Sequence, residues 1–432
     1  MNYIISIFYL ALAIFMLYKI KMYQVSGISK HWFAAAFGYK VILAIAMLFI
    51  YTRSADIKEK ADIFRFSNDA QVLYRSIKVE PSAYFKIMSG IDADNLKLFG
   101  IYNRMNNWDY SHGSQLFSNN RMLIRYLAFI NLITFGSYEA DLIITLLLAF
   151  TGLFWIFKFF NFKLKQKKWL LFVLIFFTPS IAFWTSGILK ESLLIFAIGL
   201  IFNCGNYALK GREPIARIGI VLLALLFIYN IKEFVFFLLL PPLLAYVWNH
   251  FRSKQRPFLP YLALIILGLA IANESGKLGK ENIYKTMIEK QLSFYNLAEQ
   301  DNAHSSISPI VFDATTQSVL LNSPIALINS LFRPMLWEAD NPLMIVSALE
   351  NLGILVLVLL VVIFPVKKLE NPNIFWFTLV FSISYLIVIG LTTPVLGAIS
   401  RYRVPALLFF LLALLQLIDV DSIKTLLQRN KA

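Results

Sequence analysis

The sequence predicts an all-α, polytopic membrane protein of about eleven transmembrane helices, with two large loops on the extracytoplasmic side. Of its 432 residues, 59% are hydrophobic and only 15% are charged, whereas soluble domains carry about 25% charged residues. Apolar runs of roughly 20 residues recur from end to end, and each is long enough to cross a hydrocarbon layer. One soluble core cannot hide this much apolar surface, so residues 1–432 are assigned to a single integral membrane domain solvated by lipid.

Basic residues lie in short clusters between the apolar runs, and these clusters set the predicted topology. The net charge of +15 is therefore attributed to cytoplasmic loops rather than to nucleic-acid binding. The markers of the cytoplasmic side are Lys19, Lys21, Lys30, Lys163, Lys165, Lys167, Lys168, Lys210, Arg212, Arg217, His250, Arg252, Lys254, Arg256, Lys367, Lys368, Lys424, Arg429 and Lys431.

These anchors place the N-terminus outside and the C-terminus in the cytoplasm. The first apolar run, 3–18, has no basic n-region and no small-residue cleavage site, so it is expected to be a retained helix rather than a signal peptide. The predicted spans lie near residues 3–20, 32–51, 138–160, 169–186, 190–208, 216–230, 232–248, 258–273, 345–365, 374–392 and 402–419.

The two extracytoplasmic loops are residues 52–137 and 274–344. In the first, the segment 119–136 is apolar but short, and counting it as a span would place the 163–168 lysines outside. We therefore expect 119–136 to form an interfacial or re-entrant helix. In the second loop, the amphipathic stretch 283–297 is expected to lie along the membrane surface.

The sequence assigns no metal and no cofactor. Cys204 is the only cysteine, which excludes an intrachain disulfide and a cysteine metal cluster. Asp92 and Asp94 have the spacing of a metal-binding D-x-D pair, but this signal is weak and we favour a solvated loop. A divalent metal would be compatible with this chemistry, yet no set of residues supports one. The histidines are scattered and form no zinc motif: His31, His112, His250 and His304.

Ionisable side chains at the edge of the hydrocarbon are costly and are therefore candidates for function. The first is Asp69, because a carboxylate in a partly desolvated pocket can act as a general base toward a hydroxyl group. Tyr74 follows more than one helical turn later. The alternative is that Asp69 caps a helix that starts at Ala70.

The second candidate is the predicted outside turn within residues 178–192. A proline and a glycine break the helices there, and Lys190 and Glu191 open the next span. The Lys190 ammonium is a compact point charge suited to phosphate. The alternative is a Lys–Glu ion pair with snorkelling, which Lys232 and Glu233 repeat at the next outside turn.

The third candidate is the segment 331–342 with the span that follows it. Arg333, Trp337 and Glu338 stand just before this span, where the tryptophan could serve only as an interfacial anchor. Glu350, with Asn351 beside it, lies about two turns inside. An unpaired carboxylate there would be costly, so Glu350 should be neutral, water-accessible or paired with Arg333, Arg401 or Arg403.

The fourth candidate is the pair Arg401 and Arg403, which begins the last span from outside. Guanidinium groups bind phosphate oxygens bidentately and keep their charge. The positive-inside rule cannot account for arginines on this side, so we favour a functional reading here most.

Together these motifs resemble the multi-spanning C-type glycosyltransferases, which use sugars linked to a lipid phosphate. The resemblance rests on NDA…Y at 68–74, PS…W…SG…KE at 179–191 and SRYRVP at 400–405. With FRP…WE at 332–338, the layout is similar to a bacterial subgroup of exopolysaccharide-cluster membrane proteins.

The resemblance implies an enzyme of the bacterial inner membrane. It implies Asp69 as the catalytic base, a polyprenyl-phosphate sugar as donor, and a glycan, lipid or protein as acceptor. The family's acidic loop usually follows the first helix, so the position here implies an extra N-terminal span. The implied donor-phosphate ligands are Lys190, Arg333, Arg401 and Arg403, and the supporting residues are Tyr74, Glu191, Trp337, Glu338 and Glu350.

Two other functions remain open. An O-antigen or exopolysaccharide polymerase or ligase would use similar loops and arginines, and the length of its product would identify it. A transporter or flippase for a lipid-linked glycan would need charged groups along a path open to both sides, and it would move its substrate without chemical change.

Overall fold

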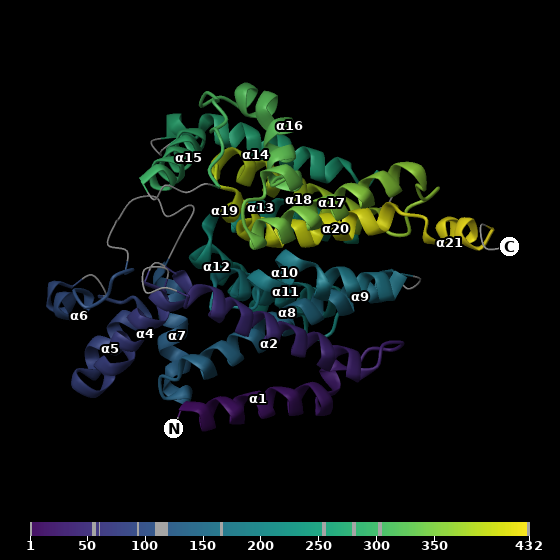
Figure 1. The fold of residues 1–432 in the computed structure, drawn as a ribbon. Coiled ribbons are helices and arrows are strands. Elements are labelled where there is room, and N and C mark those ends of the chain that lie inside the picture. Colours follow the sequence, from purple (N-terminus) through teal and green to yellow (C-terminus); the bar gives the residue numbers. More distant parts are fainter. Residues whose placement is uncertain are drawn as a thin grey trace. The chain divides into compact units, whose positions relative to one another are not determined.

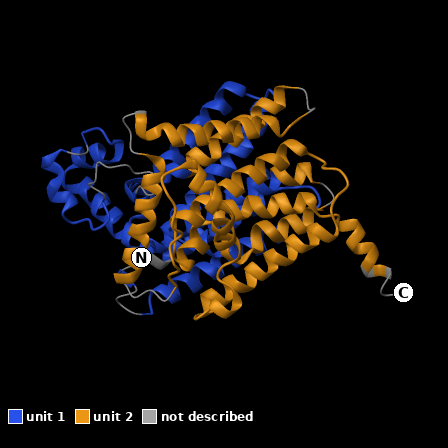
Figure 2. Ribbon diagram, turned by 90° about the horizontal axis from the view of Figure 1, so that it is seen from above, with its two compact units in different colours: residues 1–158, 182–234 blue, residues 159–181, 235–432 orange. Residues whose placement is uncertain are grey.

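The computed structural model describes residues 2–53, 58–59, 61–92, 95–108, 120–164, 167–252, 256–278, 282–300 and 305–429. Every regular element in these residues is a helix, which confirms the predicted all-α class (Figure 1). The chain forms two compact units, coloured separately in Figure 2. Unit 1 comprises residues 1–158 and 182–234, and unit 2 comprises residues 159–181 and 235–432.

Unit 1 contains the N-terminal helices and the first large loop. Its elements are α1 (Asn2–Lys19), η1 (Lys21–Tyr23), α2 (Lys30–Tyr51), α4 (Asp62–Val79), α5 (Pro81–Ser89), η2 (Leu96–Leu98), α6 (Phe99–Tyr102), α7 (Asn120–Thr134), most of α8 (Tyr138–Lys163), α11 (Lys190–Leu209) and α12 (Pro214–Ile231).

Unit 2 contains most of the C-terminal half. Its elements are α9 (Lys168–Phe177), the start of α10 (Pro179–Trp184), α13 (Glu233–Phe251), α14 (Leu259–Glu274), η4 (Ser275–Leu278), α15 (Ile283–Gln300), α16 (Thr316–Phe332), η5 (Leu336–Glu338), α17 (Pro342–Ile363), α18 (Pro372–Thr392), α19 (Leu396–Tyr402), α20 (Val404–Leu417) and α21 (Val420–Arg429).

Long apolar helices make the chain a multi-pass membrane protein. Among the described residues, eight helical segments are long and apolar enough to cross a bilayer: α2, α8, α11, α12, α13, Leu259–Lys277, α17 and α18. The pair α19 and α20, bent by 64°, would make a ninth if it is one span.

Three of the eleven predicted spans differ from this set. The span expected at 3–20 is the shorter apolar helix Ile4–Lys19. The one expected at 169–186 is broken at Thr178, whose backbone is extended, because a residue before proline disfavours the helical conformation. The span expected at 402–419 contains the bend between α19 and α20.

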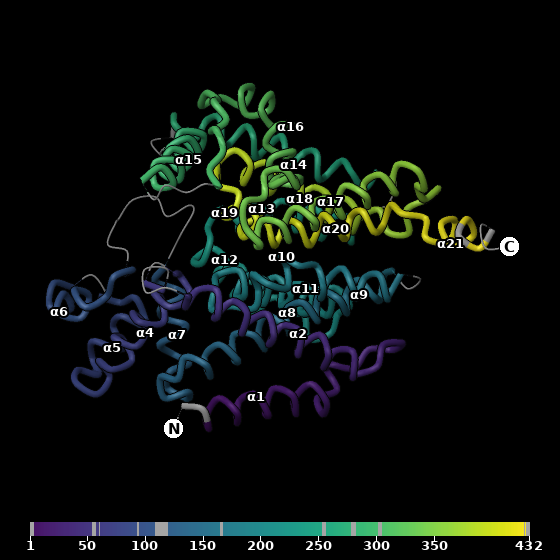
Figure 3. Tube along the Cα trace, viewed as in Figure 1, coloured from purple at the N-terminus to yellow at the C-terminus, as the bar shows by residue number. Residues whose placement is uncertain are grey.

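The first predicted loop is largely helical. α4 packs against α5 and α7, and Figure 3 traces these helices beside one another. The Gln71 side-chain amide donates to the Gly136 carbonyl at 3.3 Å, which ties α4 to the turn between α7 and α8. A helix expected at 119–136 is present as α7, and its depth in the bilayer stays a prediction.

The second predicted loop contains two helices rather than an extended excursion. α15 confirms a helix at the amphipathic stretch 283–297, and the Gln291 amide donates to the Leu391 carbonyl at 2.6 Å. α16 was not predicted, because Pro324 and its polar neighbours interrupt the apolar pattern. This helix packs on α18, where the backbones of Ala326 and Gly390 are in contact.

Candidate functional site

Asp69 lies in the middle of α4 with its side chain buried. Its Oδ1 accepts from the Asn106 amide at 3.0 Å and its Oδ2 from the Asn107 amide at 2.7 Å. The alternative that Asp69 caps a helix is therefore wrong, since α4 begins at Asp62. Burial raises the pKa of the Asp69 carboxyl, although the donors at Asn106 and Asn107 and the charge of Arg65 oppose this. The carboxylate therefore binds the loop that contains Asn106 and Asn107, and its raised pKa makes it more basic than an exposed aspartate.

The loop that Asp69 binds continues into Trp108, whose side chain is buried. The Trp108 ring stacks on Tyr102 with centroids 5.1 Å apart. The guanidinium carbons of Arg121 and Arg125 lie 5.3 and 5.4 Å from the Trp108 centroid, and Arg125 Nε donates to the Ile87 carbonyl at 2.8 Å. Asp69 thus holds a loop whose Trp108 ring lies beside Arg121 and Arg125 in the first turns of α7.

Lys190 is the first residue of α11 and is also buried. Its Nζ donates to Asn120 Oδ1 at 2.8 Å and lies 5.8 Å from the centroid of the Phe66 ring. Phe66 precedes Asp69 by about one turn of α4, so Lys190 and Asp69 belong to the same part of unit 1. The ammonium also stands at the positive end of the α11 dipole. The charge of Lys190 and the helix dipole both favour the binding of an anion.

Glu191 pairs with a lysine distant in sequence. Its Oε1 accepts from Lys232 Nζ at 2.7 Å, and both side chains are buried. The Lys–Glu interaction considered from the sequence therefore joins two predicted outside turns. Removing one member would leave an uncompensated buried charge, so this pair fixes the start of α11 against the end of α12.

Tyr74 faces a different neighbour from Asp69. Its ring lies 3.7 Å from the position that a Cβ would take on Gly136, whose φ is +76°. Tyr74 therefore packs at the turn between α7 and α8.

Lys40 is a buried charge that the sequence reading missed. It lies inside α2, a membrane-spanning helix, and is fully buried. Its Nζ donates to Thr185 Oγ1 at 2.6 Å, to the Thr185 carbonyl at 2.9 Å and to the Ala182 carbonyl at 3.4 Å. The sequence does contain a signal for it, because Lys40 is the one charged residue in the predicted span 32–51.

In unit 2, Arg403 forms the centre of a closed polar cluster. It is fully buried, and Nη2 donates to Glu350 Oε1 at 3.0 Å and to Asn351 Oδ1 at 2.6 Å. Its Nη1 donates to the carbonyls of Ser330 and Leu331, both at 3.0 Å. Of the three partners proposed for Glu350, the structure selects Arg403.

The Glu350 carboxylate has further donors. The Ser180 amide donates to Oε2 at 2.5 Å and the Ser180 hydroxyl to Oε1 at 2.6 Å. Asn351 donates in turn to the Pro334 carbonyl at 2.9 Å. Ion pairs in a low-dielectric interior need such additional hydrogen bonds to offset desolvation.

Arg333 and Glu338 form a second ion pair of unit 2. The Met335 amide donates to the same carboxylate at 2.8 Å. Burial tends to raise the pKa of Glu338, but the hydrogen bonds from Arg333 and Met335 outweigh it and lower this pKa. Trp337 beside the pair is 81% exposed, and its role as an interfacial anchor stays a prediction.

Arg401 differs from Arg403 in its surroundings. It is partly exposed, and its guanidinium carbon lies 5.7 Å from the Tyr402 centroid. Next to it, the hydroxyls of Ser400 and Ser347 are 3.2 Å apart. Of the two predicted phosphate ligands, Arg403 is fully buried with both Nη atoms bonded to protein acceptors, while Arg401 retains an accessible surface.

The predicted site residues thus form two sets, one in each unit. The structure brings Asp69 and Lys190 into one region of unit 1, and it brings Arg403 and Glu350 into one cluster of unit 2. Convergence of both sets on a single cavity stays a prediction. Unit 1 holds Asp69, Tyr74, Lys190 and Glu191; unit 2 holds Arg333, Trp337, Glu338, Glu350, Arg401 and Arg403.

Within the described part of the chain, no three His, Cys, Asp or Glu side chains group in a way that could hold a metal ion. Asp92, from the D-x-D spacing, pairs with Lys86 at 2.7 Å. Asp94, the other acid of that motif, lies outside the described residues.

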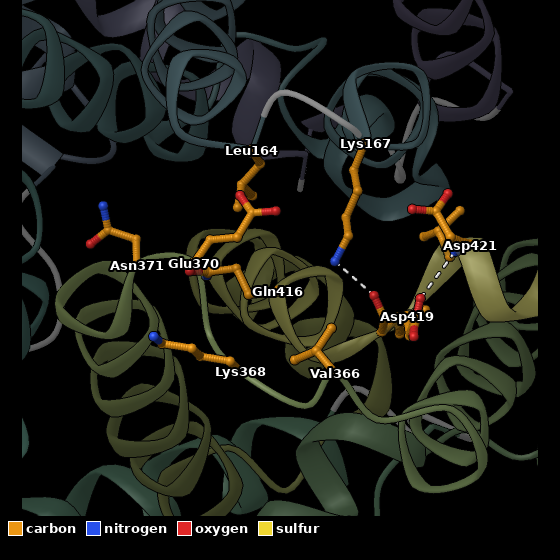
Figure 4. Close-up of a pocket in the computed structure, with 11 residues that line it drawn as sticks. Leu164, Lys167, Val366, Lys368, Glu370, Asn371, Gln416, Asp419 and Asp421 are labelled. Carbon is orange, nitrogen blue, oxygen red and sulfur yellow. Dashed lines mark hydrogen bonds between the residues drawn. The ribbon is translucent and has the colours of Figure 1, made fainter.

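A cavity of about 80 Å³ lies in unit 2, and none of the candidate site residues lines it (Figure 4). Lys167 extends into it, and its Nζ donates to the carbonyls of Leu415 at 2.9 Å and Ile418 at 2.7 Å, at the C-terminal end of α20. The remaining lining is mixed in charge, so no class of ligand stands out: Leu164, Val366, Lys368, Glu370, Asn371, Gln416, Asp419, Val420 and Asp421.

Comparison with known proteins assigns no family, because no protein-family model, no curated protein and no solved structure matches this chain. The fold and the buried charges define its class as a multi-pass α-helical membrane protein with a separate polar cluster in each unit.

Proposed function

We propose that the chain is a glycosyltransferase of the bacterial inner membrane that transfers a sugar from a polyprenyl-phosphate-type donor to an acceptor hydroxyl on the extracytoplasmic side. The N-terminus lies outside and the C-terminus in the cytoplasm. The observation that carries the proposal is the placement of a buried acid, Asp69, and a buried ammonium, Lys190, around the same turn of α4.

In the proposed reaction, the acceptor oxygen forms a bond to the anomeric carbon of the donor sugar. The bond from that carbon to the phosphate oxygen breaks, and its electron pair leaves with the lipid phosphate. Asp69 takes the hydroxyl proton. Its two backbone amide bonds occupy one acceptor site on each oxygen, and a carboxylate has about four such sites, so a proton can still be received. The raised pKa strengthens it as a base.

The leaving phosphate needs positive charge near it, and such stabilisation is usually the largest catalytic term. Lys190 supplies it, with the N-terminus of α11 behind it. Of the three arginines predicted as donor ligands, Arg401 and Arg333 are partly exposed and remain the candidates within unit 2. Arg403 serves by holding Glu350 and the end of α16 in place.

The test is release of undecaprenyl phosphate by purified protein in nanodiscs, supplied with a panel of undecaprenyl-phosphate sugars and a glycan acceptor. Asp69→Asn should lower release on the order of a hundredfold, the contribution of a general base. Asp92→Asn is the matched control, because Asp92 is an exposed acid of the same loop region, and it should keep full activity.

Two results would contradict the proposal. Full release by Asp69→Asn would remove the base, and absence of release by the wild-type protein from every donor would remove the transferase. In the same assay, joined repeat units would indicate a polymerase. A parallel assay in proteoliposomes identifies a transporter, which would move the lipid across the bilayer without chemical change.

A further inference from the structure

Lys40 has no part in the proposed reaction, yet its burial needs an explanation. A lysine inside a membrane-spanning helix is costly, and such residues are functional candidates by default. Lys40 meets that cost with three oxygen acceptors, two of them on Thr185. All three protons of its ammonium can be used in this way.

The two Thr185 acceptors belong to the turn 185–189, which directly precedes Lys190, and the Ala182 carbonyl lies in α10 just before it. This turn has its own hydrogen bonds. The Ser186 hydroxyl donates to the Ala182 carbonyl at 2.6 Å, and the Ser192 hydroxyl donates to the Gly187 carbonyl at 2.8 Å. The Leu189 amide donates to the same Gly187 carbonyl at 2.9 Å. The turn is therefore a fixed structure rather than a loose connection.

α2 supports this turn at two levels. Lys40 binds its first residue, and about two turns further along α2 the Met47 sulfur lies 2.6 Å from the position that a Cβ would take on Gly187. Leu189, the last residue of the turn, shares a core cluster with Met47 and Ile63. A Cβ at residue 187 would therefore require the Met47 side chain to move.

We propose that Lys40 is a positioning residue for the lipid-phosphate site. By binding Thr185, it fixes the turn 185–189, and the turn sets where the Lys190 ammonium and the first amides of α11 stand. This inference rests on the proposed function, because it takes Lys190 to be a phosphate ligand. The ammonium of Lys40 itself does not reach the ligand, since its donors are filled by Thr185 and Ala182.

Lys40→Met tests the proposal, because methionine is unbranched and similar in reach but carries no charge. Thr185→Val removes one acceptor from the other side of the contact and nearly preserves the shape. Lys30→Met is the matched control, since Lys30 is an exposed lysine of the same helix whose Nζ lies over the Tyr18 ring. For each, we would measure the dissociation constant of undecaprenyl phosphate by native mass spectrometry on monodisperse protein in nanodiscs. Hydrogen exchange of peptides covering 182–190 would be measured in parallel.

We expect Lys40→Met to weaken the binding of undecaprenyl phosphate about tenfold, which corresponds to ~1.4 kcal/mol. Exchange should accelerate within 182–190, Thr185→Val should shift both readouts in the same direction by less, and Lys30→Met should change neither. If Lys40→Met does not yield folded protein, the dissociation constant of Thr185→Val tests the inference instead, and an unchanged value would overturn it.

Unchanged affinity in folded Lys40→Met would overturn the inference, even if its melting temperature fell, because a purely structural lysine would produce that result. Wild-type protein that fails to bind undecaprenyl phosphate would overturn the proposed function, and this inference with it. Normal wild-type binding with normal Lys40→Met binding would overturn this inference alone.

Discussion

Unit 1 and unit 2 each bury several charges, but they satisfy them differently. In unit 2, the Arg403 guanidinium meets the Glu350 carboxylate, and its two Nη atoms also donate to two carbonyls and an amide oxygen. In unit 1, Lys40 and Lys190 donate to neutral oxygens, and the carboxylate of Glu191 is bonded by Lys232.

This difference separates a cluster that locks a fold from one that is suited to a ligand. A planar guanidinium has five donors in a fixed geometry, so protein acceptors placed around it hold it in one position. An ammonium on a flexible stem can exchange a neutral oxygen for a phosphate oxygen with little rearrangement. We therefore expect stability to depend most on Arg403, and ligand affinity to depend most on the lysines of unit 1.

The largest expected effect comes from breaking the cluster of unit 2. Arg403→Met should lower the free energy of unfolding by about 3–5 kcal/mol, because it leaves Glu350 as an unpaired buried charge. Denaturation in mixed micelles measures this. Adding Glu350→Gln should recover part of the loss, and the double-mutant cycle gives the coupling. If Arg403→Met is no less stable than Lys40→Met, the contrast between the two units fails.

An intermediate effect is expected where helices touch through glycine. A Cβ on Gly199 would lie 2.5 Å from Gly152 Cα in unit 1, and one on Gly390 would lie 2.8 Å from Ala326 Cα in unit 2. Gly199→Ala and Gly390→Ala should each cost about 1–3 kcal/mol through overpacking. Gly205→Ala and Gly353→Ala are the controls, because open space surrounds both positions, and melting temperatures equal to theirs would refute the close contacts.

The smallest expected effect concerns Lys167 of unit 2, which donates to carbonyl oxygens as Lys40 does in unit 1. Burial lowers the pKa of Lys167, and Glu370, Asp419 and Asp421 oppose this in part. Since its folded pKa is lowered, the unfolded chain binds more protons in the interval between the lowered pKa and about 10.4. Stability should therefore rise with pH in that interval, and Lys167→Met should lack this increment. Melting temperatures of both proteins across the interval measure it, and parallel curves would contradict the lowered pKa.

The sequence predicted the helical class, and it named pairing with an arginine as one of three possible states of Glu350, because both follow from local burial. Apolar runs define spans, and a carboxylate placed inside one requires a partner. It noted that a proline and a glycine break the helices within 178–192, but the predicted span 169–186 ran through Pro179, and the bond from Ser180 to Glu350 was not predicted.

Contacts between distant residues could not be predicted in the same way. Glu191 has a lysine next to it in the chain, yet it pairs with Lys232, 41 residues away. Asp69 resembles a helix cap, yet it binds the amide of Asn107, 38 residues away. In both cases a single sequence offers a plausible local partner, and only the packing of helices selects the distant one.

The pairing of Arg403 with Glu350 also constrains the order of biosynthesis. The two residues are 53 positions apart, so α17 is synthesised with its acid before the arginine exists. A charged residue within a membrane helix is costly to insert, and here Glu350 and Arg403 offset each other's cost only after both helices have met. The ribosome therefore delivers α17 in a form that stays incomplete until α20 arrives, and the last long apolar helix of unit 2 is the one that completes its assembly.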